Sequence, residues 1–172
     1  MNAEEKRNML ASLERGREAL IHALDGVSDA DSRRAPAQGR WSILDCVEHV
    51  AIAEDGLFAQ IQAATPSDLP VVNARREAAI PVRGLDRTRP IVCPASGLPT
   101  GRFSTLTSAT DHFLASRERT IHFVEENRDD LRCRLTTHAV LGDVNCYEVL
   151  LSMAVHPLRH VAQIEEIKAA LA

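Results

Sequence analysis

Apolar residues recur every three or four positions along four separate stretches of the chain, and this spacing predicts four amphipathic helices. The stretches cover residues 3–24, 43–63, 104–127 and 145–172. The last is apolar on nearly every face, which is typical of a helix buried at the centre of a fold. Four helices of this length predict an all-α fold, a four-helix bundle that forms one domain over residues 1–172.

Two of the predicted helices carry clear start signals. Ser42 is followed three positions later by Asp45, and Asn145 is followed three positions later by Glu148. In such a capping box, the two side chains bond backbone N–H groups that the first turn of a helix leaves free. We therefore expect helices to begin at these two positions, with Trp41 packed against the start of the second helix.

The segment from residue 64 to residue 103 interrupts the helical pattern. It holds six of the eight prolines and three of the eight glycines, so we expect a long proline-rich loop between the second and third helices. A solvated surface excursion is the simpler interpretation. An anion-attracting lid is the alternative, because the segment carries Arg75, Arg76, Arg83, Arg87, Arg89 and Arg102. Residues 128–144 are expected to form a second loop or a short extended piece.

Composition and charge argue against several classes of protein. Aromatic residues make up only 3% of the chain, which disfavours a β-sandwich. A net charge of −4 disfavours a nucleic-acid-binding surface. The N-terminus has no signal-peptide pattern, and the apolar runs are far shorter than the ~20 residues that span a membrane. We expect a cytoplasmic protein whose four cysteines, which form no C-x-x-C motif, are reduced.

Histidines offer the clearest candidate chemistry. His156 and His160 lie four positions apart in the last predicted helix, so both rings share one helix face and could bind one metal ion. The spacing alone is weak evidence, because it also occurs by chance. Gln163, one turn further on, could hydrogen-bond an imidazole. A catalytic metal needs a third ligand, and His49 is the best candidate, although taken alone it is an ordinary partly buried histidine.

The order of these motifs resembles the DinB superfamily. The matching residues are Trp41-Ser-Ile-Leu-Asp-Cys-Val-Glu-His49, then His138-Ala-Val-Leu-Gly142, then His156-x-x-x-His160 with Gln163 and Ile164. The resemblance implies a four-helix bundle with up-down-down-up connections, a divalent metal held by His49, His156 and His160, and homodimers. Known members include zinc-dependent S-transferases that use low-molecular-weight thiols, a mycothiol-dependent isomerase and proteins described as metal-dependent hydrolases.

Three neutral imidazoles leave at least one coordination position open. A metal there could lower the pKa of bound water, which suits hydrolysis, or hold a thiol as thiolate, which suits thiol transfer. Zinc, nickel, iron and cobalt all accept nitrogen ligands, and we expect zinc or nickel. Pro157 directly follows the first ligand and removes a backbone donor, so we expect a kink, which could tilt His156 relative to His160 and loosen the site.

Three further residues are candidates for supporting roles. Glu48 could orient His49 or act as a base, although carboxylates near a helix start are commonly dipole partners. Arg117 lies in the apolar stripe of the third helix, where it pairs with a carboxylate, reaches the surface, or clamps a substrate anion. His138 is expected to pack in the loop, with a substrate contact as the alternative. His22, His112 and His122 are expected at the surface.

These observations support three hypotheses of function. The first is a metal-dependent thiol S-transferase that joins a low-molecular-weight thiol to a small electrophile. The second is a metal-dependent hydrolase of a small substrate, assisted by Glu48 or His138. The third is a non-catalytic stress or interaction protein. We expect a small-molecule substrate and a homodimer, and no nucleic-acid or membrane partner.

Overall fold

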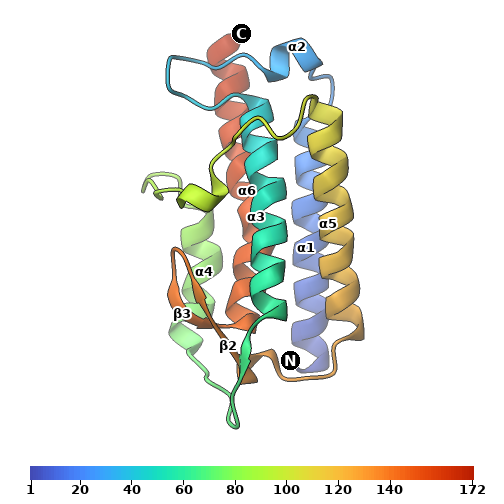
Figure 1. Ribbon diagram of the computed structural model, residues 1–172, viewed down its shortest axis with the longest axis vertical. Coiled ribbons are helices and arrows are strands. Elements are labelled where there is room, and N and C mark those ends of the chain that lie inside the picture. The colour runs from blue at the N-terminus through green and yellow to red at the C-terminus, as the bar shows by residue number, and fades with distance from the viewer.

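The computed structural model describes all 172 residues, and four long helices dominate it (Figure 1). They are α1 (Ala3–Ala23), α3 (Ile43–Gln62), α5 (Leu106–Glu126) and α6 (Cys146–Leu171). In Figure 1, α1 and α6 run upward while α3 and α5 run downward. Each helix packs on two of the others: α1 on α5 and α6, and α3 on α5 and α6. The predicted four-helix bundle and its up-down-down-up connections are confirmed.

The helix boundaries follow from the caps. The Ser42 side chain accepts from the Asp45 N–H while Asp45 accepts from the Ser42 N–H, and Asn145 and Glu148 form the same reciprocal pair. These two capping boxes were predicted, and the helices begin at the next residue. Shorter helical turns are α2 (Asp29–Ser32), η1 (Ala95–Gly97) and η2 (Leu131–Cys133).

A small antiparallel sheet lies beside the lower part of the bundle (Figure 1). It consists of β1 (Thr65–Pro66), β2 (Arg134–His138) and β3 (Gly142–Asn145), in the order β1-β2-β3. In the β2–β3 hairpin, His138 lies opposite Gly142, which has a φ of 73° that suits glycine at the turn. The short extended piece expected between residues 128 and 144 is therefore this hairpin.

The expectation of a loop throughout residues 64–103 is wrong, because the segment contains the helix α4 (Ala74–Leu85). Pro81 lies inside this helix, whose N-terminus is capped by the Asn73 side chain. Packing against α6 stabilises it: Ile80 is buried, and Arg76 forms an ion pair with the fully buried Glu148. These tertiary contacts outweigh the low helix propensity of proline.

The core consists of two apolar clusters with a polar layer between them. Each long helix contributes to both clusters. The polar groups between them are Glu54 of α3 and Arg117 and Thr120 of α5, while Gly16 of α1 lies beside Arg117 and Pro157 of α6. Arg117 is completely buried and pairs with Glu54 at 2.8 Å. The bundle is therefore not a continuous apolar column.

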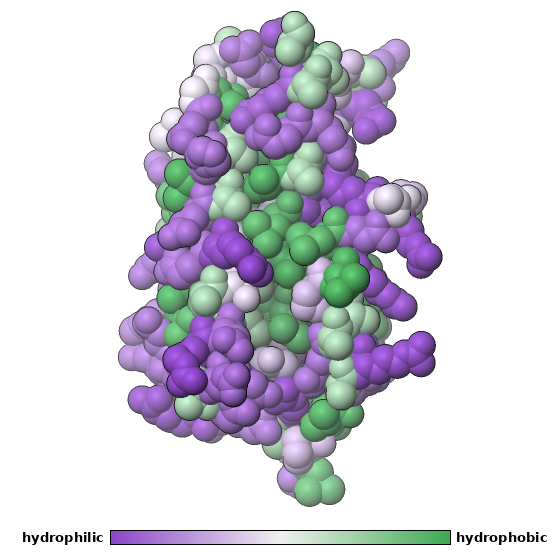
Figure 2. Space-filling view, turned by 180° about the vertical axis from the view of Figure 1, so that it is seen from behind, coloured by the Kyte–Doolittle hydropathy of each residue, from purple (hydrophilic) through white to green (hydrophobic).

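Exposed apolar side chains gather on the segment that leaves the bundle. Of the ten large hydrophobic residues that are exposed, eight lie between residues 69 and 98: Leu69, Val71, Val72, Val82, Leu85, Ile91, Val92 and Leu98. Figure 2 shows the rear face of the molecule, where apolar groups form a central band flanked by polar side chains. None of the helices combines the length and the hydropathy that crossing a bilayer requires.

Candidate metal centre

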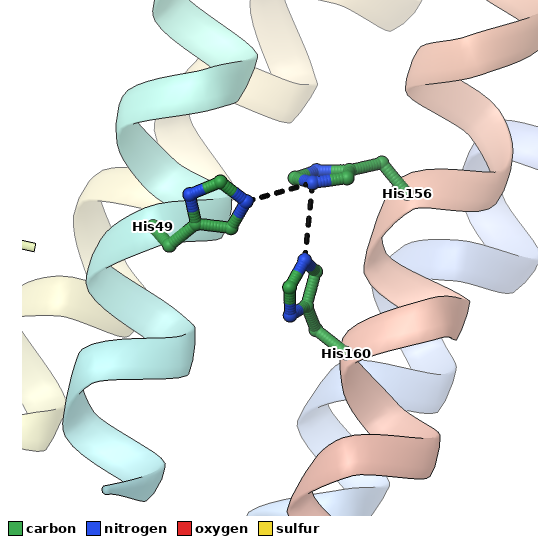
Figure 3. Close-up of side chains that lie close together, drawn as sticks. All are labelled: His49, His156 and His160. Carbon is green, nitrogen blue, oxygen red and sulfur yellow. Dashed lines mark hydrogen bonds between the residues drawn. The ribbon is translucent and has the colours of Figure 1, made fainter. Parts of the chain in front are cut away.

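Three imidazole rings meet between α3 and α6, as Figure 3 shows. The Nε2 atom of His156 lies 3.0 Å from Nε2 of His49 and 3.1 Å from Nε2 of His160. One potential ligand atom from each ring lies within 4.8 Å of the others. His49 and His160 are buried, and His156 is partly buried. The three histidines predicted as metal ligands are thus brought together.

The outer nitrogens of two rings are fixed by acceptors. His49 Nδ1 lies 2.6 Å from the Gly97 carbonyl oxygen, and His160 Nδ1 lies 3.1 Å from Gln163 Oε1. Both partners can only accept, so each Nδ1 carries the proton and donates it. Nε2 of each of these rings therefore presents a lone pair toward His156.

Burial keeps the three rings neutral. It lowers the pKa of His156 well below 6.5, helped by the neighbouring His160, His49 and Arg117. Burial also lowers the pKa of His160 to about 3, with further contributions from His49, Arg87 and Arg159. For His49, burial lowers the pKa more than its bond to the Gly97 carbonyl raises it. All three rings are therefore available as neutral ligands at physiological pH.

Three neutral rings alone have too few protons for the two N···N contacts between them. His156 Nε2 has two close neighbours, both of which carry lone pairs, and it can donate at most one hydrogen. At least one N···N contact of about 3 Å therefore lacks a proton. A divalent cation bound by all three nitrogens removes that conflict, and a tetrahedral zinc site places ligand nitrogens about 3.3 Å apart. The residues fit a divalent metal ion.

A family model of the DinB superfamily matches residues 12–164, a span that includes all three histidines. The chain belongs to the DinB superfamily. Among solved structures it resembles TT2238, a four-helix bundle protein, with a TM-score of 0.58 and 19% identity over 94% of this chain and 98% of that one. It also resembles YfiT from Bacillus subtilis, with a TM-score of 0.63 and 15% identity over 99% of this chain and 90% of that one.

YfiT is described as a probable metal-dependent hydrolase with an unusual four-helix bundle topology. At these identities, both likenesses establish the four-helix-bundle fold and no more. No curated protein matches the chain.

Pro157 does not separate the two histidines of α6. Helix α6 continues through it, and the rings on either side of this residue still converge. Proline leaves the carbonyl four residues back without its usual helical donor, and here that carbonyl belongs to Met153. Arg117 Nη2 donates to the Met153 carbonyl at 2.9 Å. This contact replaces the missing backbone bond and holds α6 in shape beside His156.

The contacts of Arg117 decide between its proposed roles. Its guanidinium donates to Glu54 and to the carbonyls of Leu13 and Met153, and the side chain has no exposed surface. Pairing with a carboxylate is therefore confirmed. The substrate-clamp interpretation is wrong, because a guanidinium buried in the polar layer of the bundle meets no substrate.

Glu48 also has a different partner from the one suggested. Its buried carboxylate accepts from the Thr100 N–H at 2.6 Å, and Asp45 is engaged in the capping box. The group that orients His49 is the backbone carbonyl of Gly97. A backbone acceptor 48 residues away leaves no signal in the sequence.

His138 packs in the β2–β3 hairpin as expected. Its Nδ1 accepts from the N–H groups of Val140 and Leu141, so its proton lies on Nε2, which is 3.5 Å from Ser152 Oγ on α6. Ser152 lies one turn before His156. His22 and His122 are exposed, and His112 is partly exposed, with its Nε2 bonded to Asp55 at 2.6 Å.

Trp41 has a role beyond the start of α3. Its ring centroid lies 5.0 Å from that of His49 and 6.1 Å from that of His160, nearly parallel to the latter. The indole therefore forms one wall of the site. Cys93 Sγ also lies close to His49, at 3.7 Å from its Nδ1.

Proposed function

We propose that this DinB protein is a metal-dependent enzyme in which zinc or nickel on His49, His156 and His160 activates a small thiol for transfer to a small electrophile. The main support for the metal is that His156 Nε2 cannot donate a proton to both of its imidazole neighbours. Three neutral rings with two outward-facing N–H groups form a stable arrangement when a cation takes the inner lone pairs. When bound, a divalent metal lowers the pKa of a coordinated thiol.

The surroundings of the rings support thiol transfer over hydrolysis. Hydrolysis at a metal commonly uses a neighbouring base, and Glu48, the carboxylate next to His49 in the sequence, is engaged by the Thr100 N–H. Thiol activation requires only a lowered pKa, which the cation supplies. In this proposal the residues of the chain orient the imidazoles and exclude water, while the thiol and the electrophile are both small molecules.

Hydrolysis is the second candidate, and one observation favours it. The His138 proton lies on Nε2 and points toward Ser152, one turn of α6 from His156. A neutral imidazole N–H in that place suits a hydrogen bond to a substrate near the metal, and YfiT is described as a probable metal-dependent hydrolase. Assays with both classes of substrate separate the two reactions.

The metal is tested by elemental analysis of protein purified without a histidine tag. We expect the wild type to contain stoichiometric zinc or nickel, and a His156→Ala, His160→Ala variant to contain almost none, because one remaining imidazole binds weakly. His122→Ala, which removes an exposed histidine from α5, is the matched control and should retain metal. Equal metal content in the wild type and the double variant would contradict the proposal.

The reaction is tested with a panel of low-molecular-weight thiols and a chromogenic electrophile. We expect a thiol-dependent rate that a chelator abolishes and that added metal restores. Ester and amide substrates are assayed in parallel. Metal-dependent turnover of those substrates alone would establish the hydrolase. Stoichiometric metal with no turnover of either class would favour the non-catalytic protein.

A further inference from the structure

Residues 84–100, which we call the strap, begin at the end of α4, contact α6 through their first part and contact α3 beside the metal centre through their last part. The first anchor is Arg159, a residue of α6 between two of the histidines in sequence. Its guanidinium donates to three carbonyl oxygens of the strap, those of Gly84, Asp86 and Arg89, at 3.3, 2.6 and 3.1 Å. Arg159 is 8% exposed and forms no direct ion pair, so these carbonyls make all of its close polar contacts, with Asp86 and Glu166 as the nearby carboxylates that offset the effect of burial on the pKa of its guanidinium.

The far end of the strap is fastened to α3. Gly97 accepts the His49 Nδ1 proton at 2.6 Å, and the Thr100 N–H donates to Glu48 at 2.6 Å. Gly97 also packs closely on the ring, because a Cβ built there would lie 3.4 Å from His49 Cε1. Consecutive residues of α3 thus hold the strap, and one of them is a metal-ligand candidate.

A third contact links the strap to His160. Arg87 makes a two-pronged ion pair with Glu166, with distances of 2.7 and 2.6 Å. Its remaining Nη1 lies 3.4 Å from Gln163 Oε1, the atom that accepts the proton of His160 Nδ1. Arg87 therefore keeps the Gln163 oxygen, and not its amide nitrogen, facing the imidazole.

We propose that the strap is a working part of the metal centre, in which Gly97, Arg87 and Arg159 act as positioning residues and strap ordering is linked to metal binding. This inference rests on the proposed metal site but on no particular reaction. The strap sets the tautomer of His49 directly and that of His160 through Gln163. A disordered strap would leave both outer nitrogens free to bond water, so either nitrogen of each ring could carry the proton.

Linkage makes the effect reciprocal. If an ordered strap tightens metal binding, bound metal must order the strap by the same factor. Groups that orient metal ligands are typically worth about tenfold to a hundredfold in metal affinity. Charge alone predicts the opposite result, because removing the Arg159 cation near a divalent ion should strengthen binding.

The first test uses zinc with a competing chromophoric chelator. We expect Arg159→Met and Arg159→Lys to weaken zinc binding by about tenfold or more, since lysine keeps the charge but cannot reach three carbonyls. Arg83→Met removes an exposed arginine from α4 and should bind zinc like the wild type. Circular dichroism of each variant checks that the bundle is retained.

Gly97→Ala tests the strap contact without touching an arginine. The added methyl would lie 3.3 Å from Cys93 Sγ and 3.4 Å from His49 Cε1, so it should push the strap away from the ring and weaken zinc binding. Gly56→Ala is the control, because no atom lies within 4 Å of a Cβ at that position.

Hydrogen exchange of the wild-type protein tests the linkage without any variant. We expect added zinc to slow exchange of the Gly97 and Thr100 amides, which bond Pro94 and Glu48, more than exchange of the α1 amides. A wild type that binds no zinc would overturn both the metal site and the strap proposal. If the strap variants bind zinc as tightly as the wild type, and if zinc leaves exchange at these amides unchanged, the strap proposal alone is overturned.

Discussion

At the scale of single residues, the site is determined by where two ring protons lie. Gly97 and Gln163 take the outward protons of His49 and His160, which leaves lone pairs on the inner nitrogens. Burial then keeps the rings neutral, so that protons do not compete with a cation for those lone pairs. In the metal-free protein, the same burial lowers the free energy of unfolding at acidic pH.

This effect predicts a pH dependence of stability in the metal-free protein. Burial lowers the pKa of His160 from 6.5 to about 3, so the unfolded chain takes up a proton that the folded protein refuses. The contribution of His160 to the free energy of unfolding should be complete above pH 6.5 and fall by about 1.4 kcal/mol for each pH unit below it, until the folded pKa is reached. His49 and His156, whose pKa values burial also lowers, add to this slope. Urea unfolding across this range measures the slope.

His160→Gln provides the comparison. It removes the titrating ring, so unfolding should take up about one proton fewer than in the wild type. The unfolding free energy of the variant should therefore depend less steeply on pH. Parallel curves for the two proteins would contradict the assignment.

Residue-level prediction from the sequence succeeds where the signal is local. His156 and His160 are recognisable because a helical repeat places them on one face, and His49 because it follows a recognisable helix start. Arg159 and Gly97 carry no such signal. Their roles depend on backbone carbonyls and rings of distant segments, which only the folded chain brings within reach.

At the scale of elements, α4 shows how packing decides a helix. Gly84 approaches α6 so closely that a Cβ there would lie 2.6 Å from Val155 Cγ2. The four long helices were predictable because their apolar repeats and caps are local. Helix α4 was not, because Pro81 and the surrounding prolines mask a short helix whose stability comes from contacts with α6, such as Arg76–Glu148.

Gly84→Ala should therefore destabilise the protein, although alanine favours helices. Alanine gains about 1 kcal/mol in propensity, but the clash with Val155 costs about 1–3 kcal/mol in a packed interface. Val155→Ala removes the clashing methyl groups, so the double variant should recover part of the loss. A double-mutant cycle of unfolding free energies measures this coupling, and strictly additive effects would show that the two residues do not meet.

At the scale of the whole molecule, the polar layer divides the core and braces α6. Arg117 crosses from α5 to satisfy Glu54 in α3, the Leu13 carbonyl in α1 and the Met153 carbonyl in α6. One side chain thus contacts all three other helices of the bundle. The bracing accounts for a proline tolerated inside the helix that carries two of the histidines.

Arg117→Met should cost about 3–5 kcal/mol in unfolding free energy, because Glu54 would remain buried without its cation. Arg117→Met combined with Glu54→Leu should be less destabilised than the single variant, since no buried charge then remains unpaired. Urea unfolding of both proteins measures the difference. A double variant with a lower free energy of unfolding than the single variant would contradict this account.

The wall beside His49 and His160 contains the only indole in the chain. Intrinsic fluorescence of this protein is consequently a local signal, emitted from the upper half of the bundle. A quenching ion held between α3 and α6 would dim the entire tryptophan emission, so occupancy can be followed optically in the native chain without an attached dye.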